Sequence, residues 1–205
     1  MAPVTPLRPR RNSNPPEMQA RAMDNLRFIR GIMESAATFT AVSGWGQVFM
    51  GLTAIAAGLI ATRADHAWSW VATWVAEAGI ATGISVASMA IKSHAANVPL
   101  LSGPIRKLIL TFSPAMLVGA VLTAVFVDKN LAALLPGTWL LLYGAAVVSA
   151  GTNSVRIVPV MGAAFMVFGT IAFLLPASAQ TWMMLSGFGG LHIVFGLWIA
   201  RKHGG

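Results

Sequence analysis

Three polar side chains lie deep inside long apolar runs of this chain, and these residues are the ones most able to do chemistry. Glu77 and His192 each lie about ten residues or more from the start of their run, which is near the middle of a bilayer, and Gln47 lies in a third run. A carboxyl group and an imidazole can both take up and release a proton. We therefore expect Glu77 and His192 to form either a proton-responsive pair or ordinary structural hydrogen bonds between helices, with Gln47 or a backbone carbonyl as the partner of Glu77.

The neighbours of these three residues indicate which way they point. On a helix, His192 shares a face with Gly189 and Gly196, and Gln47 lies close to the glycine face of its own run. A polar group that faces acyl chains is costly. We therefore expect all three side chains to face other helices.

The apolar runs are long enough to be membrane-spanning helices. Of the 205 residues, 56% are hydrophobic and 10% are charged, whereas a soluble domain has about 25% charged residues, so a soluble globular protein is excluded. About 20 apolar residues cross the hydrocarbon layer as a helix. Six runs have this length, at residues 43–62, 68–91, 108–127, 131–150, 157–175 and 181–200. The sequence thus predicts an all-α integral membrane protein whose six transmembrane helices form three hairpins.

Basic residues in the connecting segments predict the orientation. If the N-terminus is cytoplasmic, only Arg63 and Lys129 of the 14 Lys and Arg residues lie outside, as the positive-inside rule requires. We expect a plasma or inner membrane, with the N-terminus and C-terminus both cytoplasmic. The net charge of +8 then indicates contact with the lipid bilayer and its anionic lipid, not with nucleic acid. The expected interface residues are Arg27, Arg30, Arg106, Lys107, Arg156, Arg201, Lys202, Trp68, Trp139 and Trp182.

The segment before the first run has two parts. Residues 1–16 are rich in Pro and Arg, a composition typical of a disordered basic tail. Residues 17–38 form an amphipathic pattern in which the apolar side chains fall within an arc of about 160°. We expect a helix on the cytoplasmic leaflet, with a dimer or protein-docking helix as the alternative. The domains are therefore a tail at 1–16, an interfacial helix at 17–38 and a bundle at 39–205.

Glycines recur at seven-residue spacing in four runs, and such stripes allow helices to approach closely in lipid. The stripes consist of Gly44, Gly51 and Gly58, of Gly144 and Gly151, of Gly162 and Gly169, and of Gly189 and Gly196, while Gly79 and Gly83 form a GxxxG motif. They predict a tightly packed bundle, in a homo-oligomer or as a subunit of a larger membrane complex.

Part of this pattern resembles a known group. Glycines near mid-helix and a Pro after the helix occur in Met161 to Pro176, and related glycines occur in Leu185 to Gly196 and in Leu135 to Gly144. In this the chain resembles small six-helix bacterial membrane proteins of the acid-resistance HdeD type, over the last ninety or so residues. The resemblance implies a stress-related, non-enzymatic membrane protein and brings no catalytic residues.

Three function classes remain. The first is a non-enzymatic structural, stress-response or accessory subunit, the second is a small proton-linked transporter or channel centred on Glu77 and His192, and the third is an intramembrane enzyme. The chain has no Cys, and only one His lies within a run, so we expect no metal site and no cofactor. Glu77 is the single acid at depth, which disfavours catalysis by paired carboxylates. The first class is the prediction.

Overall fold

The computed structural model describes residues 15–36, 42–95, 103–152 and 154–203. Within these ranges the chain is helical and has no strand. It divides into two compact units, Met1–Ala37 and Thr38–Gly205, each of which is described by itself. Most of the expected tail at residues 1–16 lies outside the described residues.

The first unit contains one helix, α1 (Pro15–Ala36), which has 22 residues. Its start at Pro15 and Pro16 suits the first turn of a helix, where a proline loses no backbone hydrogen bond. The described side chains of α1, residues 18–30, are all exposed. This helix confirms that the amphipathic segment is helical.

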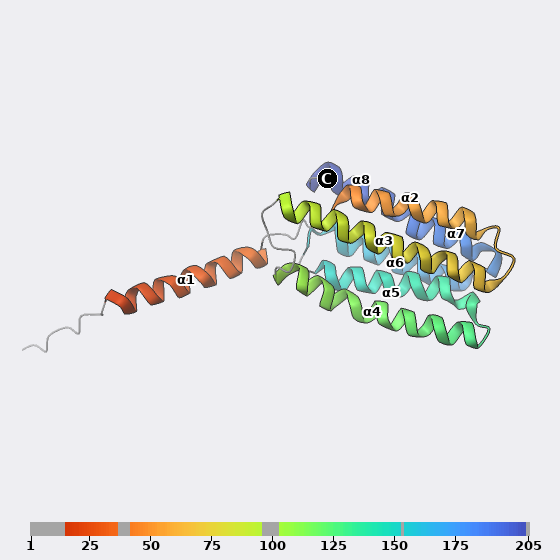
Figure 1. The fold of residues 1–205 in the computed structure, drawn as a ribbon, viewed down its shortest axis with the longest axis horizontal. Helices are drawn as coiled ribbons and strands as arrows, with labels where there is room; N and C mark the ends of the chain where they lie inside the picture. Colours follow the sequence, from red (N-terminus) through yellow and green to blue (C-terminus); the bar gives the residue numbers. More distant parts are fainter. Residues whose placement is uncertain (1–14, 37–41, 96–102, 153, 204–205) are drawn as a thin grey trace, which may run out of the picture. The chain divides into compact units, whose positions relative to one another are not determined.

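The second unit is a helical bundle (Figure 1). Its long helices are α2 (Gly44–Ala61), α3 (Ala67–Ala95), α4 (Gly103–Asp128), α5 (Leu135–Gly151) and α6 (Ile157–Leu174). The last run is divided into α7 (Gln180–Met184), the π-helix η3 (Leu185–Leu191) and α8 (His192–His203), and short 3₁₀ turns precede α5 and α7 at Ala132–Leu134 and Ala177–Ala179. Six helical stretches are long and apolar enough to cross a membrane. The expectation of an all-α chain with six such stretches is thereby confirmed.

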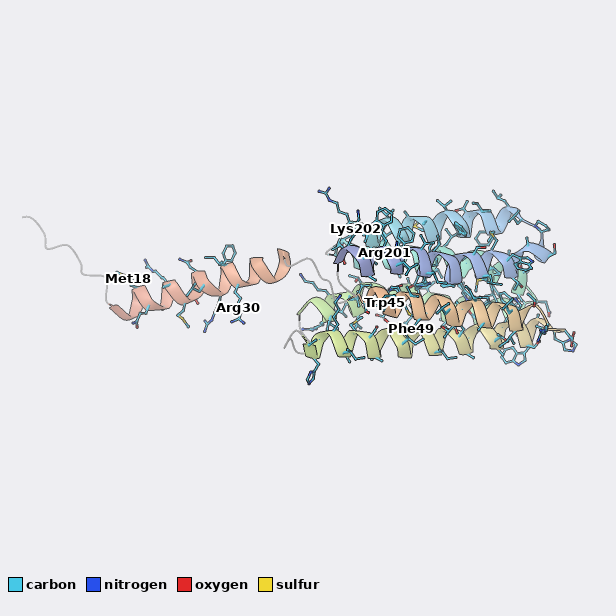
Figure 2. The ribbon with its side chains drawn as sticks, turned by 90° about the horizontal axis from the view of Figure 1, so that it is seen from above. Met18, Arg30, Trp45, Phe49, Arg201 and Lys202 are labelled. Atoms are coloured by element: carbon cyan, nitrogen blue, oxygen red, sulfur yellow. The ribbon has the colours of Figure 1, made fainter. Side chains whose placement is uncertain are left out.

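The order of the helices determines which segments lie at each end of the bundle. The connections after α2, α4 and α6 lie at one end, and α2 begins and α8 ends at the other (Figure 1). Arg63 and Lys129 belong to the first end. Exposed Arg201 and Lys202 belong to the second end, where α2 begins near Trp45 and Phe49 (Figure 2).

Two helix boundaries differ from the expected ones, because Gly and Pro residues, and not charged residues, set the limits of these helices. No Gly or Pro follows Ile91 until Pro99, so α3 continues to Ala95 and Lys92 lies on the helix instead of in a loop. Helix α4 begins at Gly103, with Pro104 in its first turn. Arg106 and Lys107 consequently lie on the helix as well.

The glycine stripes show which helices touch most closely. A Cβ placed on Gly51 would lie 2.7 Å from the carbonyl oxygen of Gly189, and one on Gly196 would lie 2.9 Å from that of Gly44. A Cβ placed on Gly144 would lie 2.6 Å from the carbonyl oxygen of Gly162. The glycines thus bring the backbone of α2 against η3 and α8, and that of α5 against α6.

The core lies where these pairs meet. Phe165, Leu140, Leu135 and Met184 are fully buried in it. Ala54 of α2 and Trp74 of α3 belong to the same cluster as Leu140 and Phe165. Residues from five different helices therefore surround the region that holds the buried polar groups.

Candidate functional site

The buried carboxyl group of Glu77 is held between α2 and α3. The side chain is 6% exposed, and Glu77 Oε1 lies 2.8 Å from the hydroxyl of Thr53. The same hydroxyl lies 3.0 Å from the carbonyl oxygen of Met50 and 3.2 Å from that of Phe49. A hydroxyl has one proton to donate and can also accept. Thr53 can therefore donate to a carboxylate, or accept from a protonated carboxyl group while it donates to its own helix.

Both ring nitrogens of His192 make hydrogen bonds. The side chain is 4% exposed, and Nδ1 lies 2.7 Å from the carbonyl oxygen of Phe188. A carbonyl can only accept, so Nδ1 carries a proton and donates it. Nε2 lies 2.7 Å from the hydroxyl of Tyr143. In the neutral ring Nε2 is then the acceptor, and the Tyr143 hydroxyl donates to it.

This histidine lies directly after the π-helix. The backbone N–H of His192 donates to the carbonyl of Gly189, and so it does not serve the carbonyl of Phe188 as it would in a regular α-helix. The ring of His192 binds that carbonyl instead. The sixth run was expected to be a helix over residues 181–200. The structure interrupts this helix with a π-helix that contains Gly187, Gly189 and Gly190.

Aromatic rings enclose the Tyr143–His192 pair. The ring centroid of Tyr143 lies 4.8 Å from that of Phe165, 5.2 Å from that of Phe188 and 5.7 Å from that of Phe112. The His192 ring lies 5.1 Å from Phe165. Edge-to-face geometry of this kind fixes ring positions, so the hydroxyl of Tyr143 is aimed at Nε2 by packing.

The structure does not join the three polar residues into one site. Glu77 is bonded to Thr53, whereas His192 is bonded to Tyr143 and to Phe188. Gln47 was an expected partner of Glu77, but its Oε1 is buried and accepts no hydrogen bond in the described part of the chain. Gln47 precedes Thr53 by six residues, nearly two turns of α2, so Thr53 and not Gln47 lies level with Glu77. The described hydrogen bonds of Glu77 and His192 thus go to different partners, and the proton-responsive pair stays a prediction.

The glycine positions fall into two classes. In four stripes every position is filled: Cβ atoms placed on Gly44, Gly51, Gly58, Gly144, Gly151, Gly162, Gly169, Gly189 and Gly196 would all lie under 3.0 Å from another atom. Gly79 and Gly83 differ, since a Cβ there would meet nothing within 4 Å. Both are exposed, so the packing role expected for this GxxxG motif is not found within the described chain.

The tryptophans also fall into two classes. Trp68 and Trp182 are 67% and 58% exposed, as an interface position requires. Trp139 is half-buried; its ring stacks on Trp70 at 5.7 Å, and its Nε1–H donates to Thr123 over 2.8 Å. Trp139 therefore ties α3, α4 and α5 together and does not simply face the membrane interface as expected.

The expected basic anchors lie at the surface. Arg106, Lys107, Arg156 and Arg201 are exposed, and the Nζ of exposed Lys202 lies 5.4 Å from the Trp198 ring. On α1, exposed Arg27 bonds Asp24 at 3.3 Å, and Arg30 is exposed too. The exposed positions of the bundle residues and of Arg30 are compatible with contact to lipid headgroups, whereas Arg27 is engaged with Asp24.

Sequence reasoning missed Tyr143, Thr53 and Trp70. Tyr143 is the single Tyr of the chain, and a lone phenol in an apolar run has a reason to find a polar partner. Trp70 donates to Thr181 over 2.9 Å, a contact between residues 111 positions apart that no local pattern indicates. Among the described residues, no group of three or more His, Asp or Glu side chains could hold a metal ion.

Comparison with known proteins returns no match: no family model, no curated protein and no solved structure corresponds to this chain.

Proposed function

We propose that this chain is a non-enzymatic, multi-pass protein of a plasma or inner membrane, and that it acts as a structural or accessory subunit of a membrane assembly. In this proposal both termini of the bundle lie on the cytoplasmic side. The positive-inside rule supports this, since the end where α2 begins carries the basic residues Arg106, Lys107, Arg156, Arg201 and Lys202. The resemblance to the HdeD type favours a stress-related assembly.

The observation that carries this proposal is the unfilled surface of α3. In the most apolar part of each span, 11% of the α3 residues and 6% of the α4 residues are buried, against 33–50% in the other four spans. Lipid tails cover Val and Ile side chains well, but a glycine notch is filled best by the backbone of another helix. Gly79 and Gly83 leave such a notch, whereas the glycine stripes of α2, α5, α6 and the last run are occupied inside the chain.

Native mass spectrometry of the full chain, extracted with its surrounding lipid, tests this proposal. We expect a complex of fixed stoichiometry, with a second copy or another membrane protein. The Gly79→Leu/Gly83→Leu variant should lose the partner. Thr82→Leu is the control, because Thr82 is exposed on the same helix but lies to one side of the notch. A wild-type chain that is monomeric in native lipid refutes an obligate subunit role.

A small proton-linked transporter is the second candidate. It is favoured by the two contacts in which a hydroxyl meets a buried ionisable group, Thr53 with Glu77 and Tyr143 with His192. A proteoliposome assay with a pH-sensitive dye separates the two functions. Proton flux that is lost in Glu77→Gln or in His192→Asn supports transport, and absence of flux in the wild-type protein at every pH removes this candidate.

A further inference from the structure

Helix α1 has an apolar face that nothing in its own unit covers. Met18 and Leu26 are each 61% exposed, and Ile29 is 50% exposed. At 100° per residue these three side chains and Ala22 fall within an arc of about 80°. The side chains of α1, with Met18 and Arg30 labelled, are drawn in Figure 2.

The charges of α1 are arranged around this face. Arg30 lies about 80° from the centre of the apolar face on one side, and Arg21 lies about 100° from it on the other. The acidic Asp24 lies farther round, at about 160°, and bonds Arg27. An arginine at the border of an apolar face can bury its stem and extend its guanidinium to a phosphate group.

The chain itself restricts what can cover α1. Helix α1 is not among the six stretches apolar enough to span, yet only residues 37–43 separate its last residue from the first residue of α2. Seven residues reach at most about 25 Å, so α1 cannot move far from the surface of the bilayer that α2 crosses. Residues 1–36 contain six Arg and three acidic residues, Glu17, Asp24 and Glu34. The segment therefore has a net positive charge.

We propose that α1 is a membrane-surface helix that inserts Met18, Ala22, Leu26 and Ile29 into the headgroup layer of an anionic phospholipid bilayer. Arg21 and Arg30 bind lipid phosphates at its two borders. The helix axis lies parallel to the membrane plane, with Asp24 and Arg27 toward water. This surface is separate from the α3 notch, and its role does not depend on the proposed assembly.

The absence of Cys from the chain allows a direct test on the full-length protein. Ala22→Cys places a single spin label on the apolar face, and Ala20→Cys is the matched control on the opposite face, since both alanines are exposed and lie about 160° apart. In nanodiscs that contain phosphatidylglycerol, we expect the label at position 22 to collide with oxygen and not with a water-soluble nickel chelate. The label at position 20 should show the reverse.

Two results would overturn the proposal. Labels at both positions that collide with the nickel chelate would mean that α1 stays in water. A label at position 22 that is shielded from both oxygen and nickel would mean that protein, not lipid, covers the face. The double variant Arg21→Gln/Arg30→Gln, made in the Ala22→Cys background, measures the contribution of the two arginines. At low salt we expect the ratio of membrane-inserted to free α1 to fall about 30-fold. An unchanged ratio refutes the phosphate contacts.

Discussion

Adding one methyl group at the contact between α5 and α6 should destabilise the bundle. A Cβ at position 144 would lie 2.6 Å from the carbonyl oxygen of Gly162 and 2.8 Å from the backbone nitrogen of Met166. Both neighbours are backbone atoms, so neither can rotate away. Gly144→Ala therefore requires the two helices to move apart by about 0.5 Å or more before ordinary contact distances return.

The size of the effect follows from two opposing contributions. Overpacking of a rigid contact costs about 2–3 kcal/mol, and replacing Gly by Ala within a helix gains about 0.5–1 kcal/mol. We expect Gly144→Ala to lower the free energy of unfolding by about 1–2 kcal/mol. Gly119→Ala is the control, because its Cβ would lie at an ordinary contact distance of 3.6 Å from Cδ1 of Leu142. The helix contribution then dominates, and this variant should be neutral or slightly more stable.

Reversible unfolding of the purified chain in mixed micelles, with increasing SDS, measures both values. Circular dichroism reports helix content, and tryptophan fluorescence reports the surroundings of the seven Trp side chains together. Gly162→Ala tests the same contact from the other helix, where the Cβ would lie 2.7 Å from the carbonyl oxygen of Gly144. Equal stability of Gly144→Ala and Gly119→Ala would show that the α5–α6 backbone contact is not as close as described.

Two further predictions concern the buried polar contacts. Tyr143→Phe should destabilise the chain by about 1–3 kcal/mol in the same unfolding assay, because it leaves Nε2 of His192 buried without a donor; an unchanged midpoint would mean that Nε2 finds another partner. Thr53→Val should cost about 1 kcal/mol and should cost less in a Glu77→Ala background, since the partner is then already absent. Fully additive losses in this double-mutant cycle would show that the Thr53–Glu77 bond contributes no coupling energy.

The glycine pattern illustrates how far the sequence predicts packing. Seven-residue spacing identified the faces through which α2, α5, α6 and the last run contact other helices. The GxxxG motif of Gly79 and Gly83 predicted the same close packing, but these two glycines face open space. A stripe shows that a helix can be approached closely, and only the arrangement of the whole bundle decides whether another helix is there.

The buried polar residues show a similar limit on what the sequence predicts. Placing Glu77 and His192 in apolar runs was enough to predict that each would need a partner. Those partners come from other helices, and their height along the bundle axis decides the choice: Thr53 is level with Glu77, whereas Gln47 is nearly two turns away on α2. The two expected members of one proton-responsive pair consequently belong to separate contacts.

Length and hydropathy alone determined that this chain has six apolar helices, because the thickness of a bilayer sets how many consecutive apolar residues a span requires. The same one-dimensional arithmetic identified α1 as a distinct amphipathic element. The tertiary structure decided which backbones meet, that the hydroxyl of Tyr143 meets Nε2 of His192, and that the Nε1–H of Trp139 donates to Thr123. These outcomes depend on distances between residues far apart in the chain, which the periodicity of any single helix does not contain.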